Sequence, residues 1–424
     1  MHPHIWHPYT NLKTAPEPLK VKSAEGVWLE LEDGRKILDG ISSWWVNTYG
    51  HGHPKISRAI YEQTKVLEHV IFAGFTHEPA EQLATKLVQR LGGGLQRVFY
   101  SDNGSTAVEI ALKMAYQYWV NLGEQRSSFL SFAGAYHGDT FGTMSMSARS
   151  LFSAVFKDLL FTVETVDYPH TYLGDSGIVQ REAVVLEQID QYLQQQTCAG
   201  ILIEPLVQGV AGMQMCRPEF LQALRKLADT RNTLLIFDEV MTGFGRTGGD
   251  FAFQVAGAVP DLICLSKGIT GGFLPFAVTV CQEKIYQAFY SDDPLHTLYH
   301  GHSYTANPLG CAAALAGLEL LEEFQPSIKG MADRHLQHLA SLQSHSLVNR
   351  VRVQGTIAAF NVGEGQDYLN QVGLEIRKQS IEQGLLLRPL GNVVYLMPPY
   401  CINDEELLMS YKIISKILDN ITIT

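Results

Sequence analysis

A nearly apolar run at 262–265 is followed by Ser266 and then Lys267, and glycines come after the lysine at 268, 271 and 272. A lysine amine in a closed site can form a Schiff base and move protons, because burial can lower its pKa. The alternative is an ordinary lysine that caps a strand end toward solvent. Lys267 alone does not decide between these two interpretations, so the neighbouring strand ends must.

Carboxylates end two further apolar runs. Glu204 follows the run "GILI", and Asp238 with Glu239 follows the run "LLIF". A partly buried carboxylate needs a cationic partner. For Asp238 this partner is either the protonated ring nitrogen of a ligand or a nearby arginine such as Arg246.

Two more segments after apolar runs could bind a flat, anionic ligand. In "SDNGST", Gly104 allows a close backbone approach, and Ser105 and Thr106 open a helix whose free N–H groups could bind phosphate. The alternative is an ordinary capped helix start. In "GAYHGD", Tyr136, next to His137, could stack on a flat ring or simply pack.

Apolar runs alternate with helical patterns at 105–119 and 218–231, which predicts a mostly parallel, doubly wound α/β sheet. In such sheets ligands bind beyond the carboxyl ends of the strands. All the polar residues above should therefore meet at one edge of the sheet. There they would line a pocket for an anionic, aromatic ligand that reacts with a lysine amine. The expected strands lie at 97–100, 129–132, 200–203, 234–237, 262–265 and 276–280.

The two ends of the chain read differently from its middle. Residues 15–40 contain "VWLELEDGRKILDG", which predicts a hairpin with "DG" at its turn. The last hundred residues show two amphipathic helical patterns, strands near 351–361 and 385–397, and a final helix at 404–420. We expect a smaller α+β domain built from both termini, 1–41 and 322–424, around a large domain at 42–321.

The bulk composition limits the class of protein. The chain has 424 residues, 18% of them charged, with a net charge of −11, which disfavours nucleic acid as a partner. No apolar run reaches the roughly 18 residues of a membrane span, and no signal pattern opens the chain. Six scattered cysteines without CxxC spacing indicate reduced thiols in a cytoplasm, and no metal site is expected.

A competing motif, "GFGRTG" at 243–248, matches the GxGxxG fingerprint of nicotinamide-binding proteins. Such a fingerprint should open a helix at once and follow the first strand of the sheet. Here "GDFAFQ" follows, without a clean helical start, and the motif comes late in the chain. This alternative is therefore the weaker one.

Together, these motifs resemble those of the class III pyridoxal-phosphate aminotransferases of fold type I, over essentially the whole chain. The opening and closing segments are similar to the family members that aminate 8-amino-7-oxononanoate in biotin synthesis. The matching stretches are the glycine-serine turn, "YHG", "IEP", "DEVMTGFGRTG", "LSKG", "LDGISSWWVNTYGHGHP" and "GHSYTANPLGCAAAL", with "HIWHPYT", "YHGDTFGTMS" and "RPLGNVVYLMPPY" for the narrower resemblance.

The resemblance implies pyridoxal 5'-phosphate as the cofactor and a role for each matching residue. Lys267 would hold the cofactor as a Schiff base and carry the catalytic proton transfers. Asp238 would keep the ring nitrogen protonated, and Tyr136 would stack on the ring. Gly104 and Ser105 would bind the phosphate.

The resemblance further implies a homodimer with shared active sites. In the family, a hydroxyl of the "GHSYT" segment reaches the phosphate held by the neighbouring subunit, and Ser303 would supply it here. Gly301 would lie in the substrate site. His302 and Ser303 stand where the best-known members have proline and threonine; serine keeps the hydroxyl, whereas the resemblance does not extend to the donor-side contacts at His302.

The expected substrates are small molecules. Arg388 would grip the distal carboxylate of the keto acceptor with its planar fork. Tyr9, also expected in catalysis, would line an aromatic slot with Trp44 and Tyr395, although core packing is the alternative for all three. The expected amino donor is S-adenosylmethionine, with lysine as the alternative donor, and a different ω-amino-acid aminotransferase of this family is a further alternative.

Overall fold

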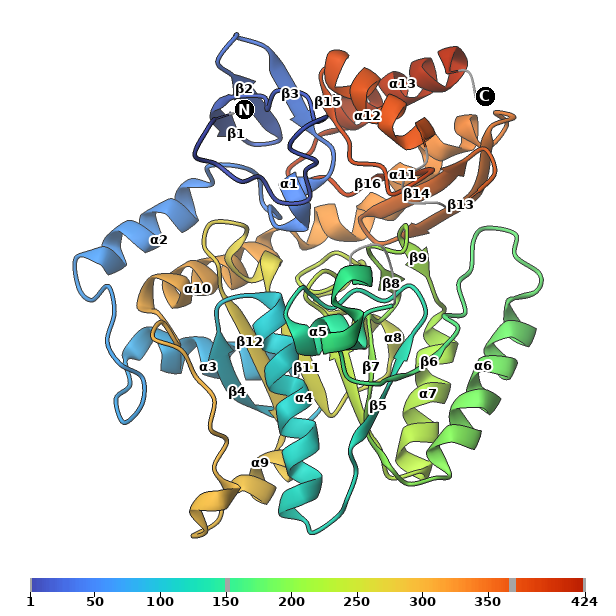
Figure 1. Cartoon of the computed structure of the whole chain (residues 1–424). Coiled ribbons are helices and arrows are strands. Elements are labelled where there is room, and N and C mark those ends of the chain that lie inside the picture. Colours follow the sequence, from blue (N-terminus) through green and yellow to red (C-terminus); the bar gives the residue numbers. More distant parts are fainter. Residues whose placement is uncertain (1, 149–152, 366–370, 422–424) are drawn as a thin grey trace.

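The computed structural model describes residues 2–148, 153–365 and 371–421, and Figure 1 shows their arrangement. A seven-stranded sheet forms the centre of the large unit, and two smaller sheets lie on the side of both chain ends. The helices are α1 (Ser42–Trp45), α2 (Pro54–Thr64), α3 (Glu78–Leu91), α4 (Gly104–Asn121), α5 (Phe141–Met146), α6 (Ile178–Leu193), α7 (Pro218–Thr230), α8 (Ala252–Ala256), α9 (Glu283–Phe289), α10 (Pro308–Glu323), α11 (Gln325–Leu342), α12 (Gln371–Glu382) and α13 (Asp404–Asn420), with short 3₁₀ turns η1 (Ala154–Leu159), η2 (Lys267–Thr270) and η3 (Pro294–His296).

The central sheet has the strand order β4-β12-β11-β10-β7-β5-β6. β12 is antiparallel to both of its neighbours, β11 and β4, and the other pairs of neighbouring strands in this sheet are parallel. The predicted mostly parallel α/β sheet is thus confirmed, and each expected run lies on a strand. The short edge strand β6 was not predicted, because "ETV" is no apolar run. The strands are β4 (Leu95–Ser101), β5 (Ser128–Phe132), β6 (Glu164–Val166), β7 (Cys198–Ile203), β10 (Leu234–Asp238), β11 (Leu262–Leu265) and β12 (Ala277–Gln282).

Both faces of this sheet are covered, which explains the uninterrupted apolar runs. In β10, Ile236 packs in the core under α4, whereas Leu235 and Phe237 belong to the larger core with α3, α6, α7 and α10. The predicted helices at 105–119 and 218–231 are α4 and α7, and α7 begins at Pro218 as expected.

The two chain ends share one small sheet, with the order β1-β2-β3-β15. The predicted hairpin is β2 paired with β3, and β15 from the far end of the chain runs parallel to β3. The region near 351–361 contains two antiparallel strands, β13 and β14, which pair on with β16. The domain limits given above stay a prediction. These strands are β1 (Val21–Glu25), β2 (Trp28–Leu31), β3 (Lys36–Asp39), β13 (Val348–Gln354), β14 (Ile357–Val362), β15 (Leu385–Leu386) and β16 (Val393–Leu396), and a separate ribbon pairs β8 (Val207–Gln208) with β9 (Gln214–Met215).

Within the described ranges, no helix combines the length and apolar character that crossing a membrane requires. All six cysteines are free, and all but Cys401 are buried.

Candidate active site

A cavity of about 380 Å³ lies beyond the carboxyl ends of the parallel strands. Gly104, Ser105, Tyr136, Asp238 and Lys267 all line it, as expected from their places at the strand ends. The structure therefore brings five of the predicted site residues together. The other lining residues are Trp45, Val46, Asp102, Asn103, His137, Gly138, Glu204, Val240, Met241, Ser266 and residues 272–276.

Lys267 leaves β11 in a backbone conformation that favours glycine, with φ 47°. Its neighbour Gly268 is packed so closely that a Cβ would stand 3.1 Å from both Phe244 and Thr48. The Lys267 amine lies 4.7 Å from the centre of the Trp45 ring. Burial lowers the pKa of this amine to about 8. The fold thus holds a lysine with a partly deprotonated amine at the cavity, as a nucleophile requires.

Asp238 is 4% exposed and pairs with His137, not with an arginine. His137 Nδ1 lies 2.7 Å from Asp238 Oδ2, and the Val240 backbone N–H donates to Oδ1 at 3.0 Å. Arg246 instead donates its guanidinium hydrogens to three backbone carbonyls, so the arginine alternative for Asp238 is wrong. The buried His137 Nε2 has no hydrogen-bond partner within the described chain.

The other two strand-end carboxylates have different surroundings. Glu204 is 6% exposed and accepts the backbone N–H groups of Tyr136 at 3.1 Å and Gly209 at 2.9 Å. Burial raises its pKa to about 7. Glu239 points away and accepts the N–H groups that open α8. Of the three carboxylates Glu204, Asp238 and Glu239, the first two line the cavity and Glu239 does not.

The start of α4 supports the phosphate interpretation of the glycine-serine turn. Asn103 caps the helix by accepting the Thr106 N–H at 3.0 Å, which leaves the N–H groups of Gly104 and Ser105 without a partner in the described chain. A Cβ on Gly104 would stand 2.6 Å from the Val240 side chain. The helix start is therefore both capped and able to bind an anion, and the helix dipole adds to its attraction for a phosphate.

The "GFGRTG" loop is filled by protein. A Cβ on Gly245 would stand 2.7 Å from Ile328 and 2.8 Å from the Tyr400 hydroxyl, which itself donates to the Phe244 carbonyl at 2.7 Å. The loop makes no immediate helix start, since α8 begins only at Ala252. These glycines serve close packing against the C-terminal part of the chain, and the nicotinamide alternative has no support.

A strip of half-exposed side chains leads outward from Tyr136. The Tyr136 hydroxyl lies 3.0 Å from the Tyr9 hydroxyl, and the Tyr9 hydroxyl also donates a hydrogen bond to Asp139. The Tyr9 ring meets Trp44 edge to face, with centroids 5.5 Å apart, and the guanidinium of Arg388 lies 4.5 Å from the centre of the Trp44 ring. The predicted substrate residues Tyr9, Trp44 and Arg388 thus lie together. Asp139, which directly follows "YHG", was not among the predicted site residues.

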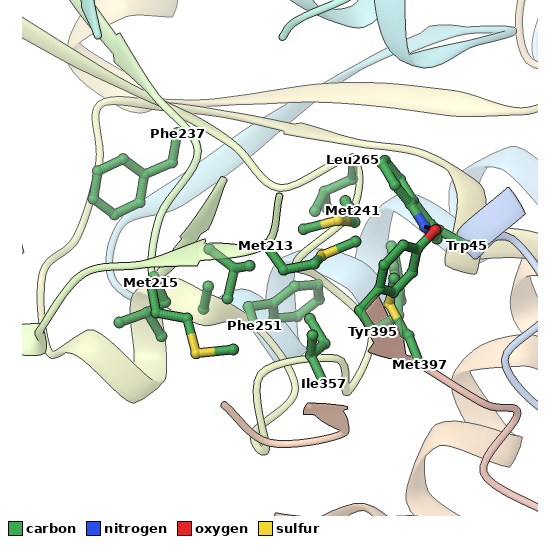
Figure 2. Close-up of a cluster of buried hydrophobic side chains, with 14 of the residues drawn as sticks. Trp45, Met213, Met215, Phe237, Met241, Phe251, Leu265, Ile357, Tyr395 and Met397 are labelled. Carbon is green, nitrogen blue, oxygen red and sulfur yellow. Dashed lines mark hydrogen bonds between the residues drawn. The ribbon is translucent and has the colours of Figure 1, made fainter. Parts of the chain in front are cut away.

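Trp45 and Tyr395 form the buried counterpart of this strip. Trp45 is 4% exposed, lines the cavity and donates its indole N–H to the Tyr395 hydroxyl at 3.0 Å. Figure 2 shows the two rings next to each other, in a cluster of buried side chains that includes Met241 and Met397. Trp44 was the predicted site residue, so the place of its neighbour Trp45 on the cavity was not predicted. Tyr395, 2% exposed, lies behind Trp45, and its contact with substrate stays a prediction.

Gly301 and Ser303 are exposed and do not line the cavity of their own chain. Their predicted roles require a neighbouring subunit and stay predictions.

Comparison with known proteins decides the family. The sequence profile of the class III aminotransferases matches residues 9–418. The chain belongs to the class III aminotransferases. Among its relatives in this family is the adenosylmethionine-8-amino-7-oxononanoate aminotransferase of Synechococcus elongatus, which is 56% identical over 421 residues and 99% of both chains.

Solved structures of class III aminotransferases agree with the fold. The adenosylmethionine-8-amino-7-oxononanoate aminotransferase from Methanocaldococcus jannaschii has a TM-score of 0.89 and 34% identity over 97% of both chains. An amine transaminase from an uncultivated Pseudomonas species, solved in its PLP-bound form, has a TM-score of 0.91 and 29% identity over 98% of both chains.

The cofactor of class III aminotransferases is pyridoxal 5'-phosphate, and the cavity fits it. The free N–H groups at the start of α4 suit a phosphate, and the Asp238 carboxylate suits a protonated ring nitrogen. The Lys267 amine suits the aldehyde, and Tyr136 offers an aromatic face. Each group is thus complementary to one part of the cofactor.

Proposed function

We propose that this protein transfers an amino group to 8-amino-7-oxononanoate and forms 7,8-diaminononanoate, a step of biotin synthesis, with S-adenosylmethionine as the donor. The observation that carries the proposal is the cavity in which Lys267, Asp238, Tyr136 and the start of α4 converge. The relatives named for this reaction, at 56% and 34% identity over nearly the whole chain, support the choice of acceptor. We also propose that the enzyme works in the cytoplasm, where its free thiols stay reduced.

Each residue has a defined task in this proposal. Pyridoxal phosphate, when bound, supplies an electron sink that stabilises negative charge at the donor's α-carbon. Lys267 Nζ would hold the cofactor through its aldehyde carbon and, as a free amine, would move the proton from that α-carbon. Asp238 holds the proton on the ring nitrogen, and His137 holds Asp238 in place. Tyr9 and Trp44 bind the substrate chain next to Tyr136.

One experiment tests the function and separates the two donors. Purified protein is mixed with 8-amino-7-oxononanoate and either S-adenosylmethionine or lysine, and the diamine is measured by mass spectrometry. We expect the diamine with S-adenosylmethionine. Product with lysine alone would establish the alternative donor. No diamine with either donor, from protein that turns over a simple ω-amino acid, would establish another substrate within the family.

Arg388 is proposed to bind the distal carboxylate of the acceptor. Replacing it by methionine is expected to raise the KM for 8-amino-7-oxononanoate by about 10- to 100-fold, because a charge-assisted hydrogen bond contributes about 1.5–3 kcal/mol. Arg388→Lys keeps the charge without the fork and should fall between the wild type and Arg388→Met. Steady-state kinetics check this, and an unchanged KM in Arg388→Met would remove the residue from the acceptor site.

We propose a homodimer in which Ser303 of one subunit completes the phosphate site of the other. The exposure of Ser303, away from the cavity of its own chain, supports this arrangement. Ser303→Ala should then weaken cofactor binding. A mixed dimer of Ser303→Ala and Lys267→Ala subunits should contain one intact site, with the wild-type affinity for the cofactor. If Ser303 acts within its own subunit, the mixed dimer contains no intact site and does not regain the wild-type affinity for the cofactor.

The lowered pKa of Lys267 predicts how the protein takes up its cofactor. Only the neutral amine attacks an aldehyde, so uptake should rise about tenfold per pH unit below pH 8 and level off above it. Stopped-flow absorbance after mixing apoprotein with pyridoxal phosphate, between pH 6.5 and 10, measures this rate. A rate that keeps rising to pH 10 would show an amine with the ordinary lysine pKa.

A further inference from the structure

The turn that carries Trp44 and Trp45 has a strained backbone. Ser42, Ser43 and Trp45 have φ values of 53°, 61° and 67°, in the left-handed region that favours glycine. Ser43 and Trp44 also depart from helical geometry inside α1. Side chains other than glycine occupy this region only where surrounding contacts hold them. Some part of the structure must therefore fix this turn.

Asp39, the last residue of β3, provides those contacts and is fully buried. Its Oδ1 accepts the Ile41 N–H at 3.2 Å. Its Oδ2 accepts the Ser43 N–H at 2.6 Å and the Ser43 hydroxyl at 3.0 Å. One carboxylate thus accepts backbone N–H groups on both sides of Ser42 and so fixes the orientation of Trp44.

His51 forms a further hydrogen bond with this carboxylate: His51 Nε2 lies 2.9 Å from Asp39 Oδ2. The hydrogen positions follow from the neighbours. The Gly50 N–H donates to Asn47 Oδ1 at 2.9 Å, so the Asn47 amide NH₂ faces His51 Nδ1 at 3.0 Å. Nδ1 therefore accepts, and Nε2 carries the hydrogen that Asp39 receives. The His51 backbone is itself tied to Gly26 in both directions, at 3.1 and 2.7 Å.

This network has a direct path to the substrate residues. Asp39 holds Ser43, the residue before Trp44, and the Trp44 ring contacts both Tyr9 and the Arg388 guanidinium. A shift of Trp44 would displace contacts with both of these side chains. Neither Asp39 nor His51 lines the cavity, so neither is placed to touch the cofactor.

We propose that Asp39 and His51 are positioning residues for the substrate: they hold the strained turn that presents Trp44 to Tyr9 and Arg388. The inference rests on the proposed function in one respect, namely that Trp44 contacts the acceptor. His51 supplies the neutral N–H donor that fixes the Asp39 carboxylate, and Asp39 fixes the turn.

The first test separates this role from a general structural one. His51→Ala is expected to raise the KM for 8-amino-7-oxononanoate about tenfold, with less than about a twofold change in kcat and unchanged cofactor absorbance. His51→Gln keeps an N–H that can reach Asp39 and should restore the KM to within about threefold of the wild type. His53→Ala is the matched control, because His53 lies in the same loop but packs on Phe324 instead. A KM in His51→Ala equal to that of His53→Ala would overturn the proposal.

The second test asks whether His51 acts through Trp44. In a Trp44→Ala background, His51→Ala should change the KM by less than about twofold, because interacting residues are not additive. A further tenfold increase would overturn the proposal. Trp44→Ala with a wild-type KM would contradict the proposed substrate contact instead.

A measurement that needs no substrate distinguishes failure of the positioning role from failure of the proposed function. The emission of Trp44 is obtained as the difference between proteins with and without Trp44→Phe, which removes the contribution of the other four tryptophans. We expect this emission to shift to the red in His51→Ala and to stay unchanged in His53→Ala. No shift in His51→Ala would overturn the positioning role, whatever substrate the enzyme uses.

Discussion

Lys267→Ala is expected to abolish turnover and to remove the visible absorbance of the bound cofactor. Alanine can neither bind the aldehyde nor move a proton, and positioned proton transfer alone contributes about 10²- to 10⁴-fold in rate. We expect kcat to fall by at least about 10⁴-fold, since both tasks are lost together. Rate measurements at saturating pyridoxal phosphate, with absorbance spectra of the same samples, check this.

Lys22→Ala is the matched control for Lys267→Ala. Lys22 is an exposed lysine of β1 paired with Glu30, far in sequence from every strand end of the cavity. Its removal should leave both rate and absorbance unchanged. A Lys267→Ala protein that kept its absorbance and its turnover would show that another group holds the cofactor.

Asp238→Asn is expected to have the second largest effect, a fall in kcat of at least about 100-fold at full cofactor occupancy. An amide has nearly the shape of the carboxylate but no charge, so it cannot hold the proton on the ring nitrogen that makes the cofactor an electron sink. The fold should survive, because the amide oxygen can still accept the Val240 N–H and His137 can change its tautomer toward the amide NH₂.

Glu239→Gln is the matched control for Asp238→Asn, one residue further along the same strand end. Glu239 points away from the cavity and accepts the N–H groups of α8, so its replacement should reduce thermal stability but leave kcat per bound cofactor unchanged. Equal losses of kcat in the two variants would indicate a general disturbance of the strand end. A kcat of Asp238→Asn within about threefold of the wild type would contradict the ring-nitrogen role.

The sequence predicted the central sheet and the convergence at its edge because both depend on local patterns. Uninterrupted apolar runs require two covered faces, and residues at the carboxyl ends of parallel strands must meet at one edge. Asp238 follows such a run directly, and Lys267, Tyr136 and Gly104 come within four residues of one, so their place on the cavity could be derived without knowing a single contact.

Long-range contacts set the features that the sequence did not predict. The partner of Asp238 is His137, which lies 101 residues away on another strand end, whereas the suggested Arg246 is nearer in sequence but turned toward backbone carbonyls. The choice between Trp44 and Trp45 depends on a strained turn that no propensity favours. Trp45 lines the cavity and donates its indole N–H to Tyr395. Tyr395 lies on β16, a strand from the far end of the chain.

The most direct measurement of the central claim is chemical trapping of the cofactor on its lysine. The holoenzyme is reduced with borohydride, digested and analysed by mass spectrometry, which locates the lysine that carries the reduced pyridoxyl phosphate. The account predicts one modified residue, Lys267, and no modification in protein first bleached by the amino donor. A label on another lysine, or none on Lys267 in the coloured enzyme, would contradict it.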